Sequence, residues 1–203
     1  MDMTHRICDL VEPLLRPDAL VPVREVLEDR SLIPDVGGVY GWWFDQELPG
    51  VPLEATLTSD RYRLLYVGIA PKAPDASGKM SRSTLRRRIC RDHLGRRLAR
   101  STLRRSLAAH LDMAVFLNAA GKRAMSEEDE QELTAWLAEH AALSFMVDPA
   151  PWRIEDELLG QGEIVFPFNI AGATHSYRSE LQARRAVKIA VPQDVDSGPP
   201  LLQ

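Results

Sequence analysis

Two tyrosines stand beside glycines in two separate apolar segments of the chain. Gly38-Val39-Tyr40 lies in the run Val36–Phe44, and Tyr66-Val67-Gly68 lies in the run Leu64–Ile69. A phenol donates and accepts hydrogen bonds, and glycine lets other groups come close to the backbone. The pairs therefore indicate either ordinary half-buried packing tyrosines with their hydroxyls at water, or two phenols that border a binding site.

A strongly basic segment follows these triplets. Residues 79–105 carry 11 lysines and arginines against one acidic residue, Asp92, although the whole chain has a net charge of −4. Such a segment is typical of a surface that binds a polyanion, and the alternative is a solvated helix rich in arginine. Ser-Thr-Leu-Arg-Arg occurs at 83–87 and again at 101–105. Both copies place arginines in a predicted first helical turn, against the helix dipole, which suggests that an external anion offsets the cost.

The elements that would position these residues follow from apolar spacing and from turn and cap residues. Short apolar runs predict strands over Val39–Phe44, Tyr62–Ile69 and Leu143–Val147. Helical spacing predicts helices over 4–15, 18–29, 83–94, 101–116, 126–140, 152–159 and 177–190, with a frayed tail over 194–203.

The composition limits the classes of protein to consider. A chain of 203 residues with 45% hydrophobic and 27% charged residues is typical of one globular domain. No apolar stretch approaches the ~20 residues of a membrane helix, and no signal peptide is visible, so we expect a cytoplasmic protein without membrane contact. Cys8 and Cys90 form no CxxC pattern, which argues against a zinc knuckle or a disulfide framework. The oligomeric state stays open.

The order of the motifs resembles that of the GIY-YIG nuclease superfamily. The two tyrosine triplets match the two signature triplets, and Leu85-Arg86-Arg87-Arg88-Ile89 is similar to the start of the family's basic helix. Further on, Glu155-Asp156-Glu157-Leu158-Leu159 resembles the family's E-x-x-L-I element, and Pro167-Phe168-Asn169 resembles its closing Pro-x-Asn element. The resemblance covers about residues 36–172.

The resemblance implies an α+β fold with a small, mainly antiparallel three-stranded sheet flanked by helices, and with additional N- and C-terminal helices. We expect an N-terminal helical extension over 1–34 and a nuclease domain over 35–172. A helical insertion would occupy about 101–140, and a C-terminal helix and tail 173–203.

The resemblance also implies a metal-dependent endonuclease that hydrolyses phosphodiester bonds in DNA. Tyr40 and a metal-bound water would activate the nucleophile, although a phenol is a poor base at neutral pH unless a cation lowers its pKa. Tyr66 would position phosphate or water, Arg88 would stabilise the phosphoryl charge, and Glu155 would bind Mg²⁺ or Mn²⁺. The expected nucleic-acid contacts are Lys72, Lys79, Arg86, Arg87, Arg91 and Asn169, of which Asn169 is better suited to fixing loop geometry.

One position departs from the family pattern. Members commonly carry a histidine or tyrosine four residues after the arginine, where this chain has Asp92, with His93 next. Either the helix is locally adjusted so that His93 reaches the site as a catalytic residue, or Asp92 pairs with Arg88 and the role is missing. The second case would leave a catalytically impaired nucleic-acid-binding module. A protein-interaction domain that uses its acidic outer helices is a third alternative.

Overall fold

An antiparallel sheet forms the centre of the fold in the computed structural model, which describes residues 11–160, 164–187 and 189–190. The three predicted strands are its main members, and the predicted fold class is confirmed. They are β2 (Gly38–Phe44) in the middle, β4 (Tyr62–Ala70) on one side and β7 (Ala141–Val147) on the other. Two-residue strands extend both edges in the order β1-β7-β2-β4-β3, with β1 at Val21–Pro22 and β3 at Thr58–Ser59.

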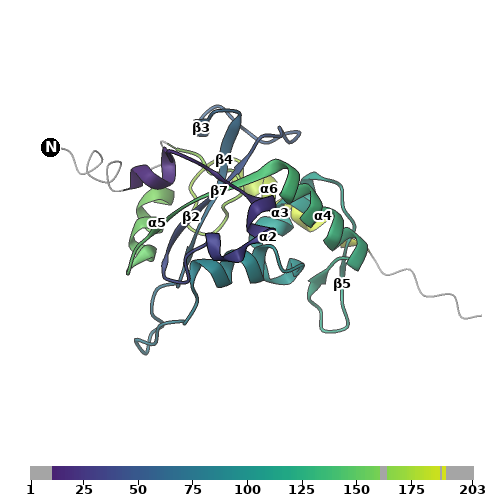
Figure 1. The fold of residues 1–203 in the computed structure, drawn as a ribbon. Helices are drawn as coiled ribbons and strands as arrows, with labels where there is room; N and C mark the ends of the chain where they lie inside the picture. The colour runs from purple at the N-terminus through teal and green to yellow at the C-terminus, as the bar shows by residue number, and fades with distance from the viewer. Residues whose placement is uncertain (1–10, 161–163, 188, 191–203) are drawn as a thin grey trace, which may run out of the picture.

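Each face of the sheet has its own hydrophobic core. Side chains alternate along β2, so that Tyr40 and Trp42 enter one core while Val39 and Trp43 enter the other. The second core packs against residues 11–15 and α5 (Pro151–Gly160). In Figure 1, α5 lies on one side of the sheet and the remaining labelled helices lie on the other. Those helices are α2 (Val23–Glu28), α3 (Thr102–His110), α4 (Glu127–His140) and α6 (Arg178–Val187).

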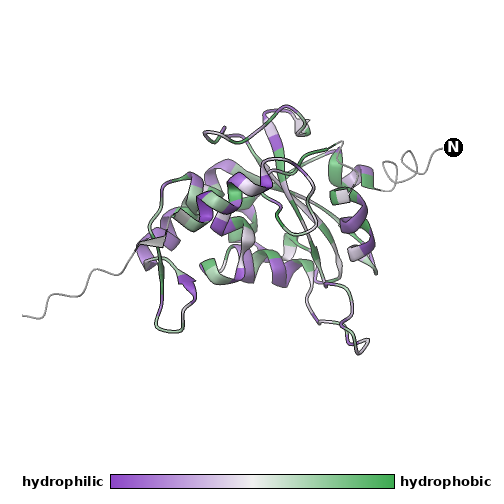
Figure 2. Ribbon diagram, turned by 180° about the vertical axis from the view of Figure 1, so that it is seen from behind, coloured by the Kyte–Doolittle hydropathy of each residue, from purple (hydrophilic) through white to green (hydrophobic). Residues whose placement is uncertain are grey.

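These helices are amphipathic, as their spacing predicts. Figure 2 shows green and purple segments alternating along the helices beside the sheet. The predicted start of α4 is confirmed, because the Ser126 hydroxyl accepts a hydrogen bond from the Asp129 amide at 3.0 Å. None of the described helices combines the length and apolarity that a membrane span requires. The predicted helix over 4–10 and the tail after 190 lie outside the described residues.

A second, small sheet replaces two predicted helical segments. Its order is β6-β5-β8, where β5 (Val115–Leu117) pairs antiparallel with β6 (Arg123–Ala124) and parallel with β8 (Ile189–Ala190). The helix predicted to reach Phe116 ends at His110, because Asp112 takes a positive φ of 56° that a helix cannot continue through. The helix predicted to reach Ala190 ends at Val187, because residues 189–190 pair with β5 instead. The region predicted as a helical insertion therefore contains a β-hairpin.

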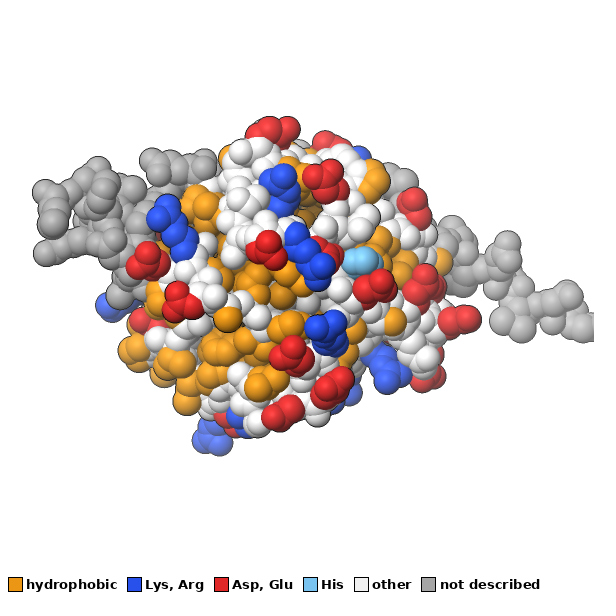
Figure 3. Space-filling model, turned by 45° about the horizontal axis from the view of Figure 1, so that its top comes forward, with side chains coloured by type: hydrophobic (Ala, Val, Ile, Leu, Met, Phe, Trp, Pro, Cys, Tyr) orange, Lys and Arg blue, Asp and Glu red, His pale blue; other side chains and the backbone are white. Residues whose placement is uncertain are grey.

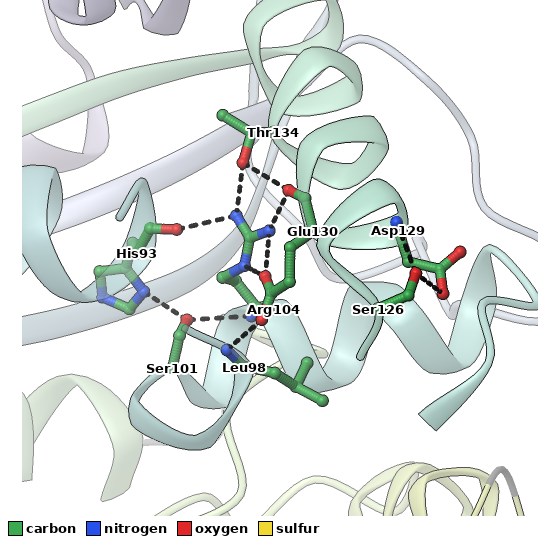
Figure 4. Close-up of polar contacts among 8 residues, drawn as sticks. All are labelled: His93, Leu98, Ser101, Arg104, Ser126, Asp129, Glu130 and Thr134. Atoms are coloured by element: carbon green, nitrogen blue, oxygen red, sulfur yellow. Dashed lines mark hydrogen bonds and ion pairs between the residues drawn. The ribbon is translucent and has the colours of Figure 1, made fainter. Parts of the chain in front are cut away.

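A buried arginine joins α3 to α4. Arg104 has no exposed surface, and its guanidinium donates from Nε and Nη2 to the Glu130 carboxylate at 2.9 and 2.6 Å (Figure 4). The remaining donors reach the carbonyl oxygens of Glu130 and His93 and the Thr134 hydroxyl. Glu130 also accepts from the Leu98 amide at 2.7 Å. All five N–H groups of the guanidinium are therefore paired, as a buried charge requires.

This pairing corrects one expectation from the sequence. We expected an external anion to offset the arginines at the start of the second Ser-Thr-Leu-Arg-Arg segment. For Arg104 the offsetting group is internal, because the Glu130 carboxylate of α4 lies against it. Ser101 caps the same helix by accepting from the Arg104 amide at 3.0 Å.

Arg104→Met should lower the free energy of unfolding by about 3–5 kcal/mol, because it leaves the Glu130 charge buried without its partner. Adding Glu130→Leu should recover part of this loss, since the unpaired charge is then removed. The measurement is urea unfolding followed by circular dichroism, with the exposed Arg97→Met as the control. A loss of less than about 1 kcal/mol for Arg104→Met, the level of a surface pair, would contradict the assignment.

Candidate active site

Three predicted site residues meet on the helical face of the sheet. Tyr40 on β2, Tyr66 on β4 and His93 on the helix that follows β4 place their ring centroids 5.5–6.4 Å from one another. Tyr40 and His93 have no exposed surface, and Tyr66 is 6% exposed. The Tyr40 hydroxyl lies 2.8 Å from His93 Nε2. Residues far apart in the sequence therefore form one buried polar cluster.

A β-bulge and a glycine arrange the two tyrosines. Trp42 pairs with Tyr66 but Trp43 pairs with Leu64, so Leu65 is an extra residue in β4. The bulge turns Leu65 and Tyr66 towards the same core. The Tyr40 phenol lies across Gly68, where a Cβ atom would be 2.5 Å from Tyr40 Oη. The glycine of the second triplet is thus required by the tyrosine of the first.

A π-helix, η2 (Arg87–His93), decides the position of His93. The sequence predicts an α-helix here, in which Asp92 would follow Arg88 on the same face. The wider turn, seen in the Leu94 amide donating to the Ile89 carbonyl at 2.9 Å, advances the register by one residue. His93 therefore faces Tyr40, as in the first of the two alternatives given for this position.

Asp92 makes the ion pair that its spacing from Arg88 suggests. Arg88 Nη1 lies 3.1 Å from Asp92 Oδ2, and it also donates to the Arg100 carbonyl at 3.2 Å. The Arg88 side chain keeps 21% of its surface exposed. The π-helix accordingly lets Asp92 hold the arginine while His93 contacts the tyrosine.

Burial, and the charges of Arg88 and Arg104, hold the pKa of His93 well below its ordinary value, so the ring is neutral. Its Nδ1 lies 2.7 Å from Ser101 Oγ, which already accepts from the Arg104 amide (Figure 4). If the Ser101 hydroxyl accepted from Nδ1 as well as from the Arg104 amide, its own proton would have no partner in the described part of the chain, so it donates to Nδ1. We therefore assign the proton of His93 to Nε2, from which it points at Tyr40 Oη.

The phenols are protonated in the unliganded protein. Burial, followed by the neighbouring Tyr66, raises the pKa of Tyr40 well above its usual value, and burial also raises the pKa of Tyr66. Arg88 acts in the opposite direction on both. Burial lowers the pKa of Arg88, but Tyr40 and Tyr66 act in the opposite direction. The net pKa lies above its ordinary value, so the guanidinium stays charged. The site thus holds a fixed cation against two neutral phenols.

Glu155, on α5, lies within electrostatic reach of this cluster. Burial, and then Asp156, raise the pKa of its carboxyl to about 7, against the opposing effects of Lys72 and Arg88. Within the described residues there is no group of three or more His, Cys, Asp and Glu side chains that could hold a metal. Mg²⁺ commonly takes one or two carboxylates and keeps its waters, so the single, partly buried carboxylate of Glu155 fits a divalent cation.

The other predicted contacts are basic residues of the loop after β4 and of η2. Lys72 and Lys79 are exposed in the loop between β4 and η2, and Arg87 and Arg91 are exposed on η2. Arg86 is partly buried, and its Nε donates to the Ile33 carbonyl at 2.8 Å. Four of the five basic side chains are therefore free to meet a ligand, and Arg86 also supports the fold.

Asn169 is buried and holds the second triplet. Its Oδ1 accepts from the Val67 amide at 2.9 Å, and its Nδ2 donates to the Val67 carbonyl at 2.8 Å. Both ends of the amide are therefore used by the strand between Tyr66 and Gly68. This arrangement is the kind of geometry-fixing role suggested for Asn169, and its contact with nucleic acid stays a prediction.

Sequence reasoning does not find Ser101, which contacts His93, or the close packing between Gly68 and Tyr40. In the sequence, Ser101 is only the first residue of the helix predicted over 101–116. A cap serine can accept from the helix and donate elsewhere at once. Nothing in its sequence neighbourhood shows that its partner is a histidine eight residues earlier.

Comparison with known proteins identifies one family. A family model described as the GIY-YIG catalytic domain matches residues 38–187. The match extends beyond residue 172, where we placed the end of the domain, and it includes α6. No curated protein and no solved structure matches the chain significantly.

Gly68→Ala should displace the Tyr40 phenol, because the added Cβ would lie 2.5 Å from Oη and 2.6 Å from Cζ. We expect a loss of about 1–3 kcal/mol in the free energy of unfolding, measured with urea. Gly160→Ala is the matched control, since a Cβ there has no neighbour within 4 Å. Equal unfolding midpoints for the two variants would contradict the packing described.

Glu155→Gln should stabilise the protein at pH 8, because it removes a carboxylate whose ionisation burial opposes. The pKa is raised from 4.5 to about 7 in the folded protein. The contribution of the protonated Glu155 to the free energy of unfolding is therefore fully present below pH 4.5 and is lost as pH rises through 7. We expect the variant to melt at a higher temperature than wild type at pH 8 and at the same temperature near pH 4.5.

Mg²⁺ should raise the melting temperature of wild type at pH 8 and leave Glu155→Gln unchanged, because bound ligand stabilises the folded state. Glu157→Gln, an exposed position on the same helix, is the control for both experiments. A melting difference between Glu155→Gln and wild type that does not vary with pH would show that Glu155 does not ionise in this range.

Proposed function

The chain belongs to the GIY-YIG catalytic-domain family, a family of endonucleases, and from this premise we propose that it is a metal-dependent endonuclease that hydrolyses phosphodiester bonds in DNA. The observation that carries the proposal is that Tyr40, Tyr66 and Arg88 lie together. Glu155 is close enough to influence the ionisation of both tyrosines, and Arg88 influences that of Glu155. Such a site combines a cation for phosphoryl oxygens, a carboxylate for a metal, and phenols that can hold or pass a proton.

Tyr40 is the proposed proton acceptor for the attacking water. To accept a proton, the buried phenol must first release its own proton to solvent, and a hydrogen-bond donor and a positive charge of the chain favour that release. His93 Nε2–H stabilises the phenolate through the 2.8 Å hydrogen bond, and Arg88 stabilises it by charge. Glu155 would hold a divalent cation, which would supply positive charge for the phosphoryl oxygens and the leaving group.

Arg88 is the proposed first contact of the substrate phosphate. Because Tyr40 has no exposed surface, a phosphate reaches it only if a neighbouring side chain moves. Arg88 is 21% exposed, and its partner Asp92 is a carboxylate that a phosphate can replace. We propose that the guanidinium exchanges Asp92 for the phosphate, while Tyr66 positions the phosphate or the water.

The exposed basic side chains of the loop and of η2, Lys72, Lys79, Arg87 and Arg91, provide the proposed DNA contacts. Figure 3 shows one face of the molecule, on which acidic and basic side chains of the described residues are interspersed. Mixed charge of this kind does not favour a polyanion. The basic segment is therefore the proposed approach for DNA.

A nucleic-acid-binding module that has lost catalysis is the second candidate. The Arg88–Asp92 ion pair favours it, because Arg88 is already occupied by a carboxylate. It predicts binding that weakens strongly with salt and no metal-dependent cleavage. The hydrogen bond between His93 and Tyr40 favours the active enzyme instead.

Purified protein with Mg²⁺ or Mn²⁺ should cut plasmid, branched or single-stranded DNA, and EDTA should stop it. Glu155→Ala should slow cleavage by about 10²–10³, the loss typical of a group that stabilises transition-state charge. Arg88→Ala should cause a loss of similar size. Gel assays of initial rates provide the measurement.

Glu157→Ala is the matched control, because it removes an exposed carboxylate from the same helix. It should cut at the wild-type rate. Absence of cleavage on all three substrates, with DNA binding retained, would favour the second candidate. Cleavage by Glu155→Ala or Arg88→Ala at the wild-type rate would refute the residue roles proposed above.

A further inference from the structure

Three arginines from different elements meet beside the candidate active site. Arg105 on α3, Arg123 on β6 and Arg185 on α6 line a small cavity together with Ala109 and Val115. We call these three residues the arginine cluster. Figure 1 shows α6 beside α3 on the same side of the sheet, with the β5 hairpin next to them. The cavity holds about one water-sized group, so a ligand meets the cluster from its open side.

The arginine cluster lacks the acidic partners that nearby arginines have. Within the described part of the chain, none of its members forms an ion pair, and the side chain of Arg105 donates only to the Thr102 hydroxyl at 3.3 Å. The Nε atoms of Arg105 and Arg185 are buried without a hydrogen-bond partner. By contrast, the adjacent Arg184 pairs with Glu180 at 2.9 Å.

The three charges are held together against their mutual repulsion. Burial, followed by Arg105 and Arg123, lowers the pKa of Arg185 to about 10. Burial and Arg123 likewise lower the pKa of Arg105. Unpaired buried donors and like charges both oppose folding, and a bound anion would relieve both at once.

The position of the arginine cluster indicates which anion it binds. Tyr66 is close enough to raise the pKa of both Arg105 and Arg185, and Arg88 is close enough to lower that of Arg105. Arg105 also donates its amide to the carbonyl of Ser101 at 3.2 Å, and the Ser101 hydroxyl contacts His93, so the cluster adjoins the place proposed for the cleaved phosphate. A nucleic-acid strand carries a phosphate at every nucleotide, and the planar guanidinium forks match phosphate oxygens.

We propose that the arginine cluster is a second phosphate site, which binds a backbone phosphate of the nucleic-acid strand next to the phosphate that is cleaved. The proposal rests on the proposed function. It makes α6 and the β5–β6 hairpin part of the substrate surface, although both lie outside the basic segment 79–105. The site would position the strand and take no part in bond cleavage.

The test measures binding of a labelled DNA duplex or single strand to the full chain in EDTA, by fluorescence anisotropy over a range of salt concentrations. Arg185→Gln should weaken binding about tenfold, the size expected for one charge-assisted contact. It should reduce the slope of log affinity against log salt by about one. Arg184→Gln, whose side chain is occupied by Glu180, is the matched control and should change neither.

Arg105→Gln, on a different helix, should repeat the loss, so the result does not depend on the fold of α6 alone. Arg185→Lys should keep the salt slope while losing part of the affinity, because it retains the charge without the fork. With Mg²⁺, Arg185→Gln should raise KM for cleavage and leave kcat close to wild type.

Unchanged binding in Arg185→Gln and Arg105→Gln, or an equal loss in Arg184→Gln, would overturn the arginine cluster alone. Binding that depends on Arg185 without any cleavage would support the cluster and refute the proposed enzymatic function. A wild-type protein that binds no DNA would refute both. Millimolar inorganic phosphate that abolishes the difference between Arg185→Gln and wild type would overturn the assignment to a nucleic-acid strand.

Discussion

The buried charge of Arg104 is the constraint on which the rest of the site depends. A guanidinium without exposed surface requires a partner for each of its donors. These partners are Glu130 and Thr134 of α4 and the carbonyl of His93. The arginine thereby fixes the end of η2, the start of α3 and one turn of α4 relative to one another. Since its own amide also binds Ser101, the same residue orients the hydroxyl that holds the His93 ring.

A chain of polar contacts leads from this charge to the candidate reaction centre. Ser101 fixes the tautomer of His93, and His93 in turn presents a proton to Tyr40. The donor that would stabilise negative charge on the phenol is therefore in place before any substrate or metal arrives, although burial keeps the phenol protonated until then. Preorganised donors of this kind stabilise charge more effectively than water that must reorient. The network also explains why so many polar side chains are buried in one small region.

Much of the fold could be predicted, because β2, β4 and β7 are continuous apolar runs and the motif order points to one family. For Asp92 and His93 the sequence left two alternatives, a locally adjusted helix or an Arg88–Asp92 pair without the histidine. The structure shows a π-helix in which the ion pair and the histidine contact are both present. The strands β5 and β8 are two or three residues long and pair across more than 70 positions, so no local period reveals them. The arginine cluster was missed for a related reason: paired and unpaired arginines look alike in sequence.

The segment between η2 and β7 contains none of the family's motifs, so a version of the chain shortened to those motifs would omit it. Here the excised piece would include both Ser101 and Glu130, which orient His93 and neutralise Arg104. A shortened version of the chain would therefore keep every motif residue of the family and still lose the contact that orients the His93 ring towards Tyr40. For this chain, the family's motif residues alone do not define the candidate site, because Ser101 and Glu130 outside the motifs hold it in place.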